Sequence, residues 1–311
     1  MDKAPDFGLP FFYRVIVPGA ILTAAATPLV DRLLTALGIP SSDLAAILAG
    51  LVIFLGFFLS LLDDSIYQIF EGRMWWPQWL SRRRTKRWGK RVETLHGKAK
   101  DPKDPMYKEY WYRLRQFPTE WDEKTQTWIP AATEPTKIGN VLASYENYPD
   151  DRYRMDSVFY WPRLWWAIDK DTRDQVDTSW AIVDSLMYTS AGAALLALIY
   201  ALSALVSYVA SLTGRVWIFS SDQQRLLATG GAASLILLAY LCMRFSVSGH
   251  LRNGETFKAL FDLNRSKLTA MAVTKVSEKE SWDQTFRYLQ YGRLPAAKPG
   301  LFVRIWQRLK A

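Results

Sequence analysis

The stretch LAAILAGLVIFLGFFLSLL, residues 44–62, decides the fold class of this 311-residue chain. It carries no charge over 19 residues, and a helix of that length is roughly 28 Å long at about 1.5 Å per residue. The hydrocarbon core of a bilayer is about 30 Å thick. The stretch therefore predicts a membrane-spanning helix, and an ordinary soluble protein is excluded.

Working outward, three more uncharged and largely apolar stretches occupy residues 15–30, 185–214 and 226–243. The mean hydropathy of the whole chain is only −0.07, because the remaining residues carry nearly all the charge. We expect a mainly α-helical polytopic membrane protein with spans at about 15–30, 44–62, 185–212 and 226–243. The first stretch has one alternative, a cleaved signal peptide, because Ala24-Ala25-Ala26 resembles a small-residue cleavage site.

The spans divide the chain into four regions. Residues 1–72 hold the first helical pair, 73–180 a basic and aromatic α+β insert, 181–244 the second pair, and 245–311 a helical tail that packs on the insert. Within the insert, residues 117–130 predict two short strands around a polar turn, and 138–145 predict a helix. The third apolar stretch is too long for one upright span, so it must tilt or extend beyond the bilayer.

The charge distribution predicts the orientation. Lys and Arg are abundant in the insert and in the C-terminal region, but the short connections at 31–43 and 215–225 contain only one and two of them. Positive charge resists translocation. We therefore expect the insert and both termini in the cytoplasm and the short connections outside.

Several classes of chemistry lack the residues that they need. The single cysteine, Cys242, excludes an intrachain disulfide, and the chain has two histidines. Neither GxGxxG nor the P-loop pattern occurs. We expect no catalytic residue, metal site or cofactor, and no enzyme, although scattered carboxylates could still converge in space.

Acidic residues mark the inner ends of two spans. Asp63 and Asp64 follow the second span, and Asp184 precedes the third at the same predicted level. In a symmetric oligomer such acids would form an anionic ring that favours cations. The alternative is that Asp63 and Asp64 cap a helix and pair with Arg73. Within the third span, Ser203 and Ser207 suit either a pore lining or a helix interface.

A cationic, tryptophan-rich segment follows the second span and carries a net charge of +9 over residues 73–100. It predicts either a belt on an anionic lipid leaflet or a site for a nucleotide or nucleic acid. Arg163, in an aromatic run, is expected either to pair with an acid or to hold an anion. The candidate ligand-binding residues are Arg82, Arg83, Arg84, Lys86, Arg87, Lys90, Arg91 and Arg163.

Helix contacts are also predicted. Pro18-Gly19 in the first span indicates a bend or a close helix approach, with Arg14 reaching to the interface. Ala193, Ala197, Ala201 and Ala204 recur at helical spacing and form a small face for close packing. An amphipathic helix over 255–271 should dock on the insert, a second is expected over 282–289, and 301–310 forms a basic amphipathic tail.

At this point a resemblance appears. PTKIGNVLASYE at 135–146, SVFYWPRL at 157–164 and GETFKALFDLNRSKL at 254–268 resemble an uncharacterised family of bacterial four-span membrane proteins, over most of residues 10–295. The layout is also similar to the membrane effectors of the Hailong antiphage system. That resemblance implies an oligomeric channel of the bacterial inner membrane that is controlled by an oligodeoxyadenylate signal, and it assigns no ligand contact to a numbered residue.

Two main hypotheses follow. The first is a homo-oligomeric ion channel, with a tetramer favoured, that responds to an oligodeoxyadenylate or other nucleotide signal and conducts ions across the lipid bilayer. The second is a membrane scaffold that recruits a cytosolic partner through its aromatic insert, without ion flux. Flux through purified protein, with and without the oligonucleotide, distinguishes the two.

Overall fold

The computed structural model describes residues 8–122, 127–212 and 221–268, together with residues 282 and 286. These residues are mainly helical, with one small two-stranded sheet, and four of their helices are long and apolar enough to cross a membrane. The expected fold class is confirmed, and the chain is a multi-pass membrane protein.

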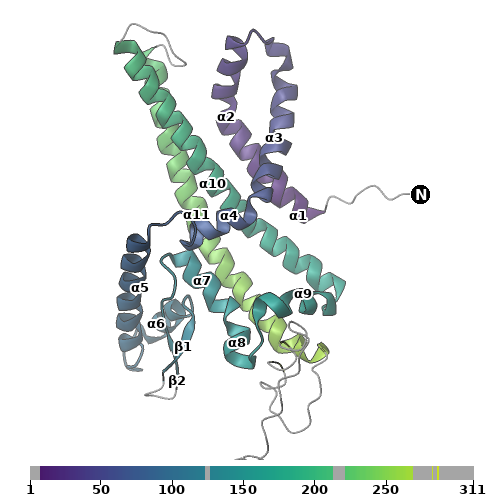
Figure 1. The fold of residues 1–311 in the computed structure, drawn as a ribbon, viewed down its shortest axis with the longest axis vertical. Coiled ribbons are helices and arrows are strands. Elements are labelled where there is room, and N and C mark those ends of the chain that lie inside the picture. Colours follow the sequence, from purple (N-terminus) through teal and green to yellow (C-terminus); the bar gives the residue numbers. More distant parts are fainter. Residues whose placement is uncertain (1–7, 123–126, 213–220, 269–281, 283–285, 287–311) are drawn as a thin grey trace, which may run out of the picture.

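The candidate spans form two pairs (Figure 1). The first pair consists of α1 (Leu9–Phe11), the π-helical segment η1 (Phe12–Ile16), α2 (Val17–Ala36), the 3-10 turn η2 (Ser41–Asp43) and α3 (Leu44–Leu61). The second pair consists of α10 (Lys170–Leu212) and α11 (Asp222–Asn264), which is followed by η3 (Arg265–Lys267). We call the end of the protein where α2 turns into α3 the connecting end, and the opposite end, where the insert lies, the insert end.

Between the two pairs of spans, the described residues form six helices and the sheet. They are α4 (Asp63–Glu71), α5 (Gln78–Lys98), α6 (Tyr107–Leu114), β1 (Thr119–Asp122), β2 (Thr127–Pro130), α7 (Lys137–Glu146), α8 (Tyr148–Tyr153) and α9 (Ser157–Ala167). The two strands are antiparallel, with Glu120 opposite Ile129, as the sequence predicts. Helix α7 matches the predicted helix. Pro149 lies in the first turn of α8, where a missing N–H costs no hydrogen bond.

Helices α10 and α11 connect the spans to the insert without interruption. Each has 43 residues, and a helix of that length extends over about 65 Å, twice the thickness of the hydrocarbon core. Helix α10 thus begins 15 residues before the third apolar stretch, and whether that stretch tilts or extends beyond the bilayer stays a prediction. Two of the expected domain boundaries, 180/181 and 244/245, fall inside these continuous helices, so each helix is shared between a span and the region beside the insert.

Small residues allow the spans to approach closely. A Cβ atom added at Gly19 would lie 2.0 Å from the carbonyl oxygen of Val52, and one added at Gly56 would lie 1.9 Å from that of Val15. The close approach expected near Pro18-Gly19 is thus confirmed. On α10, Ala193, Ala197 and Ala204 are buried as predicted, whereas Ala201 is exposed.

The insert end of α11 docks on the insert, as expected. Phe257 is buried and packs against Tyr145 and Trp161, within a core that continues from the spans into the insert. The second expected helix lies outside the described residues except for Trp282 and Phe286. Trp282 is buried, and its carbonyl accepts a hydrogen bond from the Tyr160 hydroxyl at 2.8 Å. The expected tail at 301–310 lies outside the described residues.

Candidate functional site

A charged cluster joins the first span to α10 near the insert end. Arg14 lies in η1, and its Nε donates to Asp184 Oδ2 at 2.8 Å while its Nη1 donates to Asp177 Oδ1 at 2.9 Å. Asp177 and Asp184 are two turns apart on one face of α10. Burying a carboxylate is costly unless it is paired, and Asp184 is only 6% exposed. Arg14 therefore holds the two helices together.

Two tyrosines extend this cluster to α4 and α11. The Tyr67 hydroxyl donates to Asp184 Oδ1 at 2.6 Å and lies 3.4 Å from Nε2 of His250, which is fully buried on α11. The Tyr188 hydroxyl donates to Asp63 Oδ1 at 2.9 Å. We call these residues the polar junction; its members are Arg14, Asp63, Tyr67, Asp177, Asp184, Tyr188 and His250. The polar junction joins η1, α4, α10 and α11 at the level where the spans meet the insert.

These contacts change two expectations. Arg14 was expected to reach the membrane interface as an anchor, but it is an ion-pair partner inside the protein. Asp184 was expected at an open mouth beside Asp63 and Asp64, but it is buried and its charge is balanced by Arg14. Asp63 is half-buried and only Asp64 is exposed. The alternative pairing with Arg73 is wrong as well, because Arg73 contacts Glu71 and Glu134.

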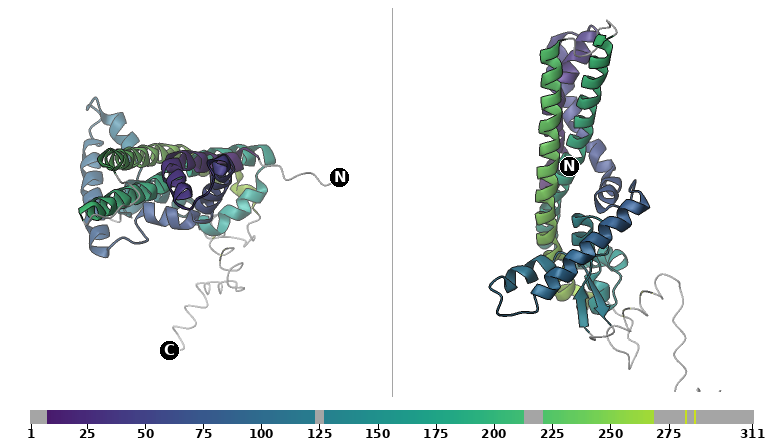
Figure 2. Two further views of the ribbon diagram at one scale, coloured as in Figure 1. Left: turned by 90° about the horizontal axis from the view of Figure 1, so that it is seen from above. Right: turned by 90° about the vertical axis from the view of Figure 1, so that its left-hand side faces the viewer.

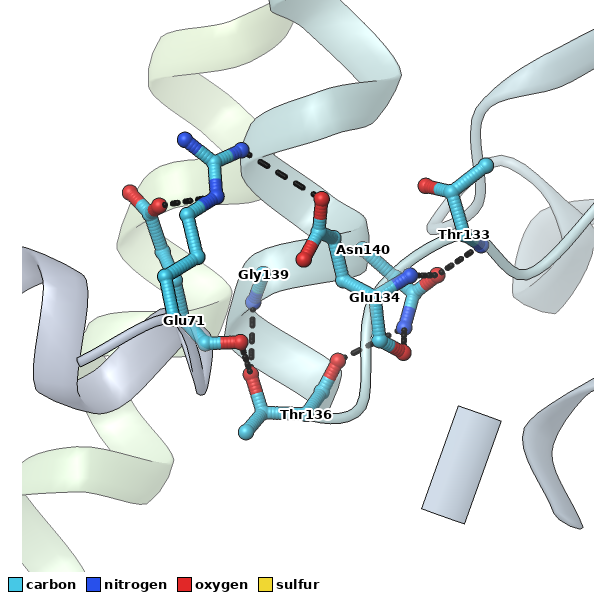
Figure 3. A network of polar contacts seen from close by, with 7 residues as sticks. Glu71, Thr133, Glu134, Thr136, Gly139 and Asn140 are labelled. Atoms are coloured by element: carbon cyan, nitrogen blue, oxygen red, sulfur yellow. Dashed lines mark hydrogen bonds and ion pairs between the residues drawn. The ribbon is translucent and has the colours of Figure 1, made fainter. Parts of the chain in front are cut away.

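A second polar network connects the end of α4 to the start of α7 (Figure 3). Gly72 ends α4 with φ +88°, and a Cβ there would lie 2.4 Å from Pro135. Thr136 caps α7 by accepting from the Gly139 amide at 3.0 Å, and it donates to the Glu71 carbonyl at 3.1 Å. The fully buried Asn140 side chain accepts from two amides and donates to two carbonyls, so it makes all the hydrogen bonds that an amide side chain offers.

Charge in this α4–α7 network is unbalanced. Arg73 Nε lies 3.0 Å from Glu71 Oε2, and Arg73 Nη2 donates to Glu134 Oε1 at 3.3 Å. Burial raises the pKa of Glu71 to about 7; Arg73 opposes that effect, while Glu146 and Glu134 add to it. Burial also raises the pKa of Glu146. Three carboxyl groups thus share one guanidinium, and Glu71 changes its charge near neutral pH.

The basic candidate residues lie on α5, which Figure 2 shows crossing beside the lower ends of the long helices. A hollow of about 580 Å³ is lined by Leu80, Arg83, Arg84, Lys86, Arg87 and Lys90. In the part of the chain that the structure describes, none of these cations forms an ion pair. The opposite face of α5 packs on α6 through Val92 and Leu114, which are both buried. Helix α5 thus presents an uncompensated positive surface on a fixed support.

Two further cationic candidates lie apart from that hollow. Arg91 stacks at 5.3 Å over the ring of Trp88. Arg163, on α9, is exposed; its guanidinium lies 3.6 Å from the centroid of Phe159, and its Nη1 donates to the carbonyl of the same residue at 2.6 Å. The expectation of an acidic partner for Arg163 is therefore wrong, because a ring face and a carbonyl serve instead. Figure 1 shows α9 and α5 on opposite sides of the insert end, so one small ligand does not reach both.

The two serine candidates lie on α10 toward the connecting end. Ser207 is buried, and its carbonyl accepts from Arg225 Nη1 of α11 at 3.3 Å; Ser203 is half-buried. Ser207 therefore belongs to the contact between α10 and α11 within this chain. Among the described residues, no group of three or more His, Cys, Asp or Glu side chains is placed to hold a metal ion.

Sequence reasoning missed most of the polar junction and the α4–α7 network. One signal was available, since Asp177 and Asp184 are seven residues apart and would share a face of any helix that contains both. Comparison with protein-family models, curated proteins and solved structures found no match to this chain. The residues themselves therefore carry the functional argument.

Proposed function

We propose that this chain is the subunit of a homo-oligomeric ion channel of the bacterial inner membrane, controlled by an anionic nucleotide or oligonucleotide on the cytosolic face of α5. The observation that carries the proposal is the polar junction. It connects three of the four candidate spans to α4, and α4 leads directly to the basic helix. A ligand that displaces α5 would therefore act on the spans through fixed polar contacts.

The uncovered surface of the spans supports an oligomer. Gly56 and Leu59 are the buried residues of α3, whereas Phe54, Phe57 and Phe58 are exposed. The two helical pairs diverge toward the connecting end (Figure 1), where Arg32 of α2 still donates to Gln224 of α11 at 3.1 Å. Neighbouring subunits or lipid must cover these phenylalanine side chains. A pore that forms between subunits does not need a channel through the middle of each subunit.

The scaffold hypothesis retains support from a different feature. Trp75, Trp79, Val158 and Trp166 are all more than 60% exposed on the insert and its connection to α4. Exposed large apolar side chains, aromatic ones above all, are typical of protein or membrane contacts. A scaffold would bind its partner there and would conduct no ions.

Ion flux through purified protein in liposomes distinguishes these functions. We expect flux to change when oligodeoxyadenylate is added on the side of the insert. The variant Arg82→Gln, Arg83→Gln, Arg84→Gln should lose that response, because it removes three cations from the exposed face of α5. The matched control, Lys100→Gln, Lys103→Gln, Lys108→Gln, loses equal charge and should respond like the wild type. Liposomes that stay tight under both conditions, with inserted and folded protein, would favour the scaffold.

A further inference from the structure

A groove of about 490 Å³ lies between α6 and the α10–α11 pair. None of its lining residues belongs to the polar junction or to the basic hollow of α5. Its walls include Ile182 and Leu186 of α10, Phe245, Ser248 and Arg252 of α11, and Arg115, which directly follows α6. The groove therefore lies where the apolar spans give way to the charged insert.

The side chains of this groove change from apolar to cationic along its length. Phe245, Ser248 and Arg252 share one face of α11 at positions i, i+3 and i+7. Arg252 lies about 10 Å farther than Phe245 toward the insert end, at about 1.5 Å per residue. Leu186 lies on the membrane side of Ile182, since α10 runs in the opposite direction. Phe245 is 59% exposed, which leaves an apolar surface open at the membrane end.

The cationic end of the groove lacks a counter-charge. Arg115 and Arg252 are exposed, and within the described ranges neither forms an ion pair. The one carboxylate of the groove, Glu255, accepts from Lys258 at 3.3 Å. Two free guanidinium groups above an apolar wall suit a ligand with a phosphate at one end and a hydrocarbon chain at the other.

We propose that this groove holds one phospholipid with an anionic headgroup. Its phosphate lies against Arg115 and Arg252, and an acyl chain lies along Ile182, Leu186 and Phe245. A free phosphate or nucleotide would leave the apolar wall uncovered, whereas a lipid satisfies both ends. The proposal is independent of ion conduction and of any signal at α5.

Native mass spectrometry of the delipidated full-length protein in detergent tests the site, with phosphatidylglycerol and phosphatidylcholine as probes. The wild type should retain phosphatidylglycerol preferentially, and inorganic phosphate should not displace it. Arg115→Gln with Arg252→Gln should weaken phosphatidylglycerol binding about 30-fold, at about fivefold for each cation removed near a membrane surface. Lys103→Gln with Arg152→Gln removes equal charge elsewhere and should bind like the wild type.

A second variant tests the apolar end of the groove. Phe245→Ser should reduce retention of both lipids, because it removes an acyl-chain contact and leaves the arginines in place. If the arginine variant does not fold, two measurements on the wild type still test the proposal. These are its preference for phosphatidylglycerol over phosphatidylcholine and the failure of inorganic phosphate to displace the bound lipid. Equal retention of the two lipids, displacement by inorganic phosphate, or undiminished binding by a folded arginine variant would overturn the proposal.

Discussion

Glu71 is expected to make the protein less stable as the pH rises through neutrality. Its side chain is almost fully buried between α4 and α7, where burial raises its pKa from 4.5 to about 7. The folded protein therefore keeps this proton at pH values where the unfolded chain has released it. Since the native state binds more protons, the free energy of unfolding falls as pH rises between these two values, and the loss is complete above pH 7.

The size of the effect follows from the two pKa values. A tenfold change in a proton equilibrium corresponds to about 1.4 kcal/mol, so ionised Glu71 costs the fold roughly 3 kcal/mol in total. Between about pH 5 and pH 8 the expected loss is roughly 2.5 kcal/mol, since part of the change occurs below pH 5. At about 2 °C for each kcal/mol, the melting temperature should fall by roughly 5 °C.

The variant Glu71→Gln removes the titration and keeps the shape of the side chain. In a non-ionic detergent, its melting temperature should exceed that of the wild type at pH 8 and should vary less with pH. Some slope remains because the pKa of Glu146 is raised too. Glu120→Gln, at an exposed position of β1, is the matched control and should follow the wild type. Parallel melting curves for wild type and Glu71→Gln across this pH range would refute the reasoning.

Three further outcomes are expected. Asp184→Asn should lower the free energy of unfolding by about 3 kcal/mol, because it leaves Arg14 with one carboxylate fewer in a half-buried site; chemical denaturation in detergent measures this. Gly56→Ala should destabilise the folded protein by about 2 kcal/mol or more, since its new Cβ would meet a backbone carbonyl of the first span at 1.9 Å. Gly50→Ala in the same helix meets nothing within 4 Å and should be neutral or stabilising, so equal melting temperatures for the two variants would contradict the close-contact explanation. If the protein conducts ions, Asp64→Asn should shift the reversal potential away from cation preference, because this acid is exposed and uncompensated; an unchanged potential would remove it from the permeation path.

The placement of the polar residues explains why sequence reasoning found only part of the site. The basic face of α5 was recognisable from the sequence, because a dense run of cations is too costly to bury and stays at the surface of the folded protein. The pairing of Arg163 with an acid was wrong for a different reason, and its role in holding an anion stays a prediction. Its aromatic neighbours suggested burial, but α9 turns the guanidinium outward onto the ring of Phe159.

The sequence by itself determined the four spans, the small hairpin and helix α7. Each of these depends on local hydrophobicity and periodicity, which a bilayer or a short turn converts directly into structure. The partner of Arg14 could not be found in this way, because Asp184 lies 170 positions away in the chain. Only the packing of η1 and α4 against α10 and α11 brings those charges and Tyr67 together, and only the joining of α4 to α7 buries Glu71. Long-range packing decides these contacts. A buried charge is stable only beside a partner of opposite charge or a hydrogen-bonding group, and here that partner comes from a distant part of the chain.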